Sequence, residues 1–208
     1  MPKPASELAD RLNRRFRSLE LTRAKIEILR NALSLSMRDV ELVYEGLFLS
    51  AHSAFENFIE DLFVGLLLKG KRSVSRRRNI IPRIQVQSES IAYDLILGNR
   101  KKYVDWLPYK NTLEYAEIFF RGGRPFSELD EYQKDHLVKC LFVRNAIAHK
   151  SKYSLRKFEE EVIGNTPLVH REKTPSGYLR GIFRTTPPQT RYENMIAQLS
   201  QIAAKLAQ

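Results

Sequence analysis

Residues 141–150 read Leu-Phe-Val-Arg-Asn-Ala-Ile-Ala-His-Lys, near the end of a helix that is predicted to begin at about Asp130. Apolar residues recur through this helix, so it is expected to be largely buried. An arginine, an amide and an imidazole, at Arg144, Asn145 and His149, interrupt the apolar run. Burying such groups is unfavourable unless partners satisfy them. A chain that needed only a core would have Leu or Ala at these positions, so the pattern indicates another task.

Helix geometry predicts where these three side chains lie. A helix turns by about 100° per residue, so Asn145 and His149, four positions apart, are expected on one face. Arg144 lies one step round, and its long stem brings the guanidinium within reach of the same place. A purely structural explanation is that Arg144 pairs with a carboxylate on a neighbouring helix while His149 hydrogen-bonds a carbonyl near the helix end. The three residues alone leave both explanations open.

The order arginine, polar residue, three spacers, histidine resembles the motif of the HEPN family, whose helical domains are in many cases metal-independent endoribonucleases. The likeness covers six motif residues and, in general architecture, the helices at about 5–68 and 110–163. The sequence Ala-Phe-Glu-Asn-Phe at 54–58 most resembles the RiboL-PSP-HEPN or MAE-type groups. In some branches a tyrosine follows the histidine by two positions. Ser151 stands there in this chain, a departure from the branch that is regulated by tyrosine modification.

The resemblance implies a role for each motif residue. Arg144 would brace the phosphate, His149 would act as acid and base, and Asn145 would orient the imidazole. It also implies a homodimer with a composite active site, cleavage to a 2′,3′-cyclic phosphate and a 5′-hydroxyl, and no metal or cofactor. A toxin or antiviral-defence effector, restrained by a cognate antitoxin or sensor protein, is the implied biological setting.

The chemistry of RNA agrees with such a site, because RNA carries its own nucleophile in the 2′-hydroxyl. A histidine with an ordinary pKa of about 6.5 exchanges protons near neutral pH, and an arginine stabilises charge on the reacting phosphate without changing its own protonation. Cleavage needs both a base and an acid, whereas each chain supplies one such histidine. A two-fold dimer would supply the second.

Composition favours a polyanionic partner. The 208 residues are 43% hydrophobic, which is typical of a folded chain, and we expect a single domain over residues 1–208. The net charge of +11 favours nucleic acid first, and an acidic protein or anionic membrane second. The basic residues cluster in an insert at about 69–87 and again near 100–102. These clusters suit either of two interpretations, a surface that binds RNA phosphates or loops that increase solubility. The candidate RNA-binding residues are Arg76, Arg77, Arg78, Lys101, Lys102 and Lys150.

The chain is expected to be mainly α, an HEPN-like helical bundle with a small C-terminal β-hairpin. Helices are predicted at about 6–35, 37–68, 88–97, 112–120, 130–150, 154–162 and from 190, and the hairpin at about 168–183. Ser36 and Asp39 suit a cap for the second helix. Along its flank run Glu45, His52 and Glu56. Glu56 is a candidate partner for Arg144, although it would equally suit His52 or a solvated flank.

Other sites and compartments find little support in the sequence. The single cysteine, the lack of zinc-ligand spacing and the lack of paired acidic clusters predict a metal-free protein. No apolar run is long enough to span a bilayer and the N-terminus has no apolar signal segment, so a cytoplasmic protein is expected. The sequence therefore predicts a metal-independent endoribonuclease. The alternatives are a non-catalytic HEPN-like module that binds RNA, a nucleotide or a partner protein, and a basic DNA-binding accessory protein.

Overall fold

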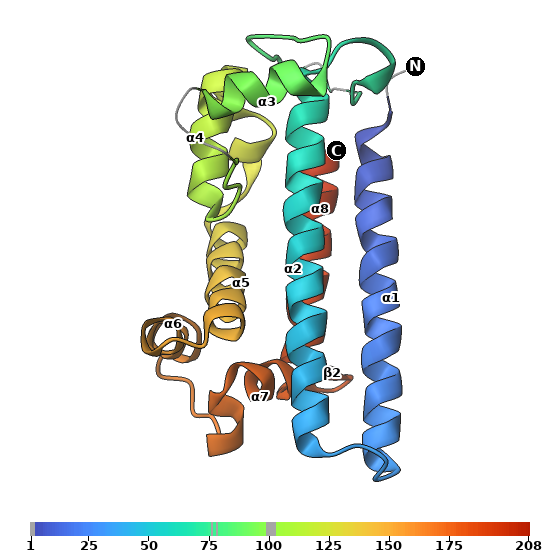
Figure 1. Ribbon diagram of the computed structural model, residues 1–208, viewed down its shortest axis with the longest axis vertical. Coiled ribbons are helices and arrows are strands. Elements are labelled where there is room, and N and C mark those ends of the chain that lie inside the picture. Colours follow the sequence, from blue (N-terminus) through green and yellow to red (C-terminus); the bar gives the residue numbers. More distant parts are fainter. Residues whose placement is uncertain (1–2, 76, 78, 99–102) are drawn as a thin grey trace. The chain divides into compact units, whose positions relative to one another are not determined.

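The computed structural model describes residues 3–75, 77, 79–98 and 103–208. Within these residues the protein is mainly helical, with a small two-stranded antiparallel sheet near the C-terminus, which confirms the prediction of a mainly α chain with a C-terminal hairpin (Figure 1). The helices are α1 (Ala5–Asn31), α2 (Met37–Leu67), α3 (Glu89–Leu97), α4 (Tyr109–Phe119), α5 (Glu131–His149), α6 (Lys152–Phe158), α7 (Pro175–Arg180) and α8 (Arg191–Ala207), and the strands are β1 (Ile182–Thr185) and β2 (Pro188–Thr190).

The chain divides into two compact units. The first contains residues 1–12, 55–134 and 200–208, and the second contains residues 13–54 and 135–199. Helices α1, α2, α5 and α8 each contribute residues to both units. The expectation of a single domain over residues 1–208 stays a prediction.

In the second unit, α1 and α2 run antiparallel and are joined by a short turn (Figure 1). Leu33 ends α1 in the left-handed region at φ 57°, and the Ser34 N–H donates to the Leu29 carbonyl at 2.9 Å. The predicted cap of α2 is confirmed, because the Asp39 N–H donates to Ser36 Oγ at 3.2 Å and the Ser36 N–H donates to Asp39 Oδ2 at 3.0 Å. Reciprocal bonds of this kind satisfy N–H groups that a helix start leaves unpaired.

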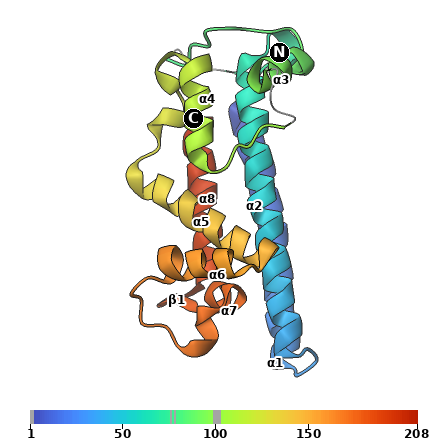
Figure 2. The same cartoon turned by 60° about the vertical axis from the view of Figure 1, so that its left-hand side comes forward.

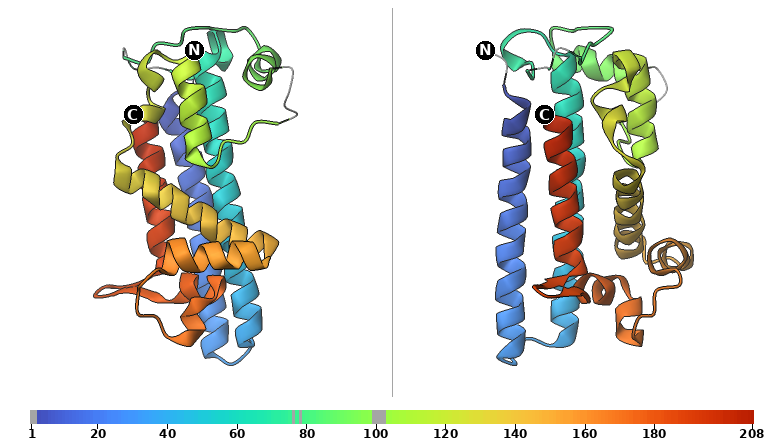
Figure 3. Two further views of the ribbon diagram at one scale, coloured as in Figure 1. Left: turned by 90° about the vertical axis from the view of Figure 1, so that its left-hand side faces the viewer. Right: turned by 180° about the vertical axis from the view of Figure 1, so that it is seen from behind.

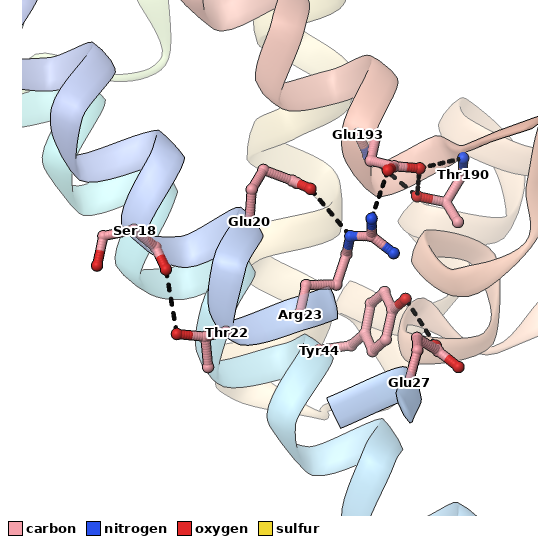
Figure 4. Close-up of polar contacts among 8 residues, drawn as sticks. All are labelled: Ser18, Glu20, Thr22, Arg23, Glu27, Tyr44, Thr190 and Glu193. Atoms are coloured by element: carbon pink, nitrogen blue, oxygen red, sulfur yellow. Dashed lines mark hydrogen bonds and ion pairs between the residues drawn. The ribbon is translucent and has the colours of Figure 1, made fainter. Parts of the chain in front are cut away.

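A cluster of ion pairs and hydrogen bonds joins α1, α2 and α8 within the second unit (Figure 4). Arg23 on α1 donates to Glu20 at 3.0 Å and also pairs with Glu193 on α8. The Tyr44 hydroxyl on α2 donates to Glu27 on α1 at 2.8 Å. Burial raises the pKa of the Glu20 carboxyl, and Arg23 acts in the opposite direction. The cluster fixes the register of these helices and hence the position of the α2 side chains that follow Tyr44.

The hairpin lies farther along the chain than the sequence predicted. Residues 170–173 form a 3₁₀ turn, α7 follows, and β1 pairs with β2 in the short hairpin drawn at left in Figure 3. Thr174 begins a helix because its Oγ1 accepts the Gly177 N–H at 3.1 Å and Pro175 follows at the first helical position, where a missing N–H costs nothing. Gly177 has no room for a Cβ, which would lie 1.9 Å from the Arg171 carbonyl oxygen.

The first unit is built around aromatic side chains. The Phe63 ring on α2 lies 4.9 Å from Trp106, 5.0 Å from Phe120 and 5.1 Å from Phe126, measured between ring centroids. Trp106 is buried, as packing rather than base stacking requires. The described part of the basic insert is tied to this unit by backbone hydrogen bonds, from Val74 to Gly65 at 2.8 Å and from Val86 to Leu67 at 2.9 Å.

Candidate functional site

The predicted site lies on the part of α5 that belongs to the second unit. Cys140, Val143, Ala146 and Ile147 are buried, and they form the apolar face of the helix. The buried face is narrower than the sequence predicted, since Val138 is 41% exposed. The motif residues lie at the edge of this face, where Arg144 and Asn145 are half-buried and His149 is exposed. The arginine and the imidazole are therefore not sealed inside the chain.

Two adjoining features of the backbone fix the end of α5. Lys150 adopts a left-handed conformation at φ 48°, and its N–H donates to the Ala146 carbonyl at 3.2 Å. The next residue caps α6, which turns away from the axis of α5 (Figure 2). Ser151 Oγ accepts the Ser154 N–H at 3.1 Å, and Ser154 Oγ accepts the Ser151 N–H at 3.1 Å. The sequence predicted that this helix begins at about residue 154, whereas the reciprocal bonds place its cap at Ser151. His149 is consequently held as the last residue of α5.

The three motif side chains meet at the guanidinium of Arg144. Its Nη1 donates to Asn145 Oδ1 at 3.0 Å and lies 3.4 Å from His149 Nε2. A guanidinium is always a donor, so the second contact requires a neutral imidazole whose proton is on Nδ1. In this arrangement the single lone pair of His149 Nε2 is directed at the guanidinium of Arg144. The amide of Asn145 binds the guanidinium, whereas the sequence assigned it to the imidazole.

A carboxylate on α2 pairs with the residue that follows the motif, and it is Glu45 rather than the candidate Glu56. Glu45 Oε2 accepts from Lys150 Nζ at 2.7 Å, and the glutamate side chain is 17% exposed. This ion pair fastens the residue after His149 to α2. Glu56, which the sequence made only a candidate partner of Arg144, is half-buried on the part of α2 that belongs to the first unit. Its role stays a prediction.

Two of the predicted RNA-binding residues, Arg77 and Lys150, lie among the described residues, one in each unit. Arg76, Arg78, Lys101 and Lys102 lie outside the described residues. Arg77, in the first unit, pairs with Glu128 at 2.7 Å. Lys150, in the second unit, is the partner of Glu45. Because both described cations are already paired, each would bind a phosphate only in competition with its carboxylate.

His52 is a residue of the site that the sequence reasoning left without a role. It lies on α2, seven positions after Glu45 and therefore on the same face of the helix, and is 3% exposed. Burial, and to a lesser extent the positive charge of Arg144, lowers its pKa to about 4. Its Nε2 is buried without a hydrogen-bond partner among the described residues, which costs about 1–3 kcal/mol. The spacing Glu45–His52 was the signal that would have found it.

A pocket of about 310 Å³ lies elsewhere in the second unit, and none of the motif residues lines it. Its wall includes Arg180, which binds Glu27 through Nε at 2.8 Å and Nη2 at 2.9 Å. Arg23 and Arg171 also line the pocket. In the described part of the chain, no group of three or more His, Cys, Asp and Glu side chains converges as a metal site would.

Comparisons with family models, with curated proteins and with solved structures found no match to this chain. Among the residues that the structure describes, no helix has the length and apolar character needed to cross a membrane. The site is therefore interpreted from its own geometry and from the motif.

Proposed function

We propose that this chain is an HEPN-type endoribonuclease that cleaves RNA without a metal ion. The observation that carries the proposal is the meeting of Arg144, Asn145 and His149 at the end of α5, with Arg144 Nη1 3.0 Å from the amide oxygen and 3.4 Å from the imidazole. The exposure of His149 and the half-exposure of Arg144 support it, because a phosphate must reach both groups.

The reaction is a transesterification within the RNA. A base removes the proton of the 2′-hydroxyl, the 2′-oxygen forms a bond to phosphorus, and the bond from phosphorus to the 5′-oxygen breaks. An acid returns a proton to the leaving 5′-oxygen. His149 serves in one of these proton transfers, and the guanidinium of Arg144 stabilises the added negative charge on the phosphate. The products are a 2′,3′-cyclic phosphate and a 5′-hydroxyl.

A second copy of the chain completes the proposed site. The two proton transfers need two groups, and in each chain the motif offers one exposed histidine. A two-fold dimer that brings two α5 ends together supplies the other histidine and a second arginine. By the same resemblance we propose a cytoplasmic toxin or antiviral-defence effector that is restrained by an antitoxin or sensor protein.

The function is tested with Arg144→Ala and His149→Ala in the presence of excess EDTA. Each variant is expected to lose RNA cleavage by about 100-fold or more, the usual effect of removing a group that stabilises the transition state. Arg184→Ala and His170→Ala are matched controls, since both residues are exposed elsewhere in the second unit. Cleavage by a labelled-RNA assay is compared at equal folded concentration, judged by circular dichroism.

Two results would contradict the proposal. Unchanged cleavage in both motif variants would remove the enzyme assignment, and RNA binding without cleavage by the wild-type chain would favour a binding module. Light scattering checks the composite site separately, because a strict monomer at micromolar concentration is incompatible with it.

A further inference from the structure

The buried ring of His52 has no hydrogen-bond partner at Nε2 in the described part of the chain, and the positive charge of Arg144 contributes to the lowering of its pKa. A core position on α2 needs no such group, and the neighbouring core positions Phe48, Ala51 and Phe55 are apolar. An unsatisfied buried nitrogen is unfavourable, so packing alone does not explain the histidine.

A second buried histidine of the same unit has hydrogen-bond partners at Nε2 and serves as a comparison. His136 on α5 is 8% exposed, and burial lowers its pKa to about 4, as it does for His52. Its Nε2, however, lies 3.2 Å from the Met195 carbonyl oxygen and 3.4 Å from Cys140 Sγ. The two rings share burial and charge state and differ in whether Nε2 is satisfied. The charged neighbour of His52 that affects its ionisation is Arg144.

His52 is unsuited to proton transfer with RNA. At 3% exposure its ring cannot touch a phosphate or a ribose bound at the exposed His149. Arg144, in contrast, is half-buried, and so extends from the interior toward the surface. In both described hydrogen-bonding contacts of its guanidinium, with Asn145 and with His149, the nitrogen involved is Nη1. A guanidinium has five N–H donors, so its other nitrogens are able to serve a phosphate and one further acceptor.

We propose that His52 is the positioning residue of Arg144: its uncharged ring accepts a hydrogen bond at Nε2 from the guanidinium when the other edge of the guanidinium binds the phosphate of RNA. The inference rests on the proposed function and deepens it. With Asn145 on one nitrogen and His52 on another, the guanidinium plane is fixed at two points. A planar donor fixed in this way presents its remaining N–H groups to the phosphate in one orientation.

The role is tested by replacing His52 with Leu and with Gln. His52→Leu removes the acceptor and is expected to lower kcat by up to about 100-fold with little change in KM, because misplacing a catalytic group by about 1 Å has effects of that size. His52→Gln keeps an uncharged acceptor and should recover most of the rate. His136→Leu is the matched control, and it should affect stability but leave kcat of the folded enzyme near the wild-type value. A folded His52→Leu variant with wild-type kcat would overturn the inference.

A titration followed by NMR tests the same inference without cleavage. In Arg144→Ala the pKa of His52 should rise, because a neighbouring positive charge has been removed, whereas the pKa of His136 should not change. An unchanged His52 titration in Arg144→Ala would show that the two side chains do not interact, and would overturn the inference. If the wild-type chain cleaves no RNA, the proposed function fails, and the titration still decides whether His52 and Arg144 are coupled.

Discussion

Two buried histidines, His52 and His136, give the folded chain a defined response to acid. Each has a pKa of about 4 in the folded state, against an ordinary value of about 6.5. Between these values the unfolded chain binds protons that the folded chain does not. Stability is therefore lost as the pH falls from about 6.5 to about 4, and it changes no further through these groups below that. Over this pH range each ring lowers the free energy of unfolding by about 3 kcal/mol.

We predict that His136→Gln reduces the acid sensitivity of folding. The variant replaces the ring that bonds the Met195 carbonyl by a flexible amide in a buried site, so it should be less stable than wild type at about pH 7. It should lose less stability than wild type between about pH 7 and about pH 4.5, since it no longer carries that ionisable ring. Urea unfolding at the two pH values measures the difference. Glu20, whose pKa burial raises, acts in the opposite direction, but it does so equally in both proteins. An equal loss in wild type and variant would contradict the prediction.

At the scale of elements, the ends of helices decide where the functional groups lie. His149 is the last residue of α5, Lys150 closes the helix in a left-handed conformation, and Ser151 begins the next cap. A non-glycine residue in the left-handed region is strained by about 1–2 kcal/mol. At Lys150 the ion pair with Glu45 offsets part of this cost. The strained residue therefore directly follows His149, at the end of the helix that carries the site.

Leu33, which closes α1, carries the same strain without such a partner. It lies at φ 57° with 82% of its surface exposed. Leu33→Gly should therefore raise the free energy of unfolding by about 1 kcal/mol, because glycine adopts this conformation without a Cβ clash. Leu33→Ala is the control, and it should change stability by less than about 0.5 kcal/mol because it keeps the strain. Chemical denaturation of the three proteins provides the measurement, and a less stable glycine variant would refute the assignment of strain.

Periodicity predicted the helices well, since long apolar stripes such as Tyr44, Phe48 and Phe55 leave no other regular structure possible. It failed where short polar signals compete. Thr174 and Pro175 suit either a hairpin turn or a helix start, and the close approach of the Arg171 carbonyl to Gly177, which selects the helix, is a tertiary fact. The hairpin accordingly formed farther along the chain, at 182–190.

The candidate site was predictable in its residues but not in its contacts. The spacing of Arg144, Asn145 and His149 placed them on neighbouring faces of one helix. Which acceptor the guanidinium takes depends on rotamers and on the partner helix, and the structure pairs it with Asn145. The role suggested for His52 depends on the burial of its ring. The sequence placed this residue at the border of the apolar stripe of the second helix, so its burial was not evident. The Glu45–Lys150 pair depends likewise on the approach of α2 to the end of α5 within the second unit.

At the scale of the whole molecule, the proposed activity depends on the net charge and on two-fold symmetry. A net charge of +11 favours a polyanionic partner, over a range of about 10 Å at ordinary salt, but it does not distinguish binding from cleavage. The chemistry does distinguish them. A site of arginine and histidine would rely on the 2′-hydroxyl of the substrate, so the proposed enzyme is expected to cut RNA and spare DNA.

The chemical identity of the cleaved ends tests this account most directly. A defined RNA is incubated with the wild-type chain in excess EDTA, and the fragments are weighed by mass spectrometry. Attack by the 2′-oxygen predicts fragments that end in a 2′,3′-cyclic phosphate and begin with a 5′-hydroxyl, and predicts no cut at a site whose 2′-hydroxyl is replaced by hydrogen. Fragments with a 3′-hydroxyl and a 5′-phosphate, or cleavage that EDTA abolishes, would contradict it.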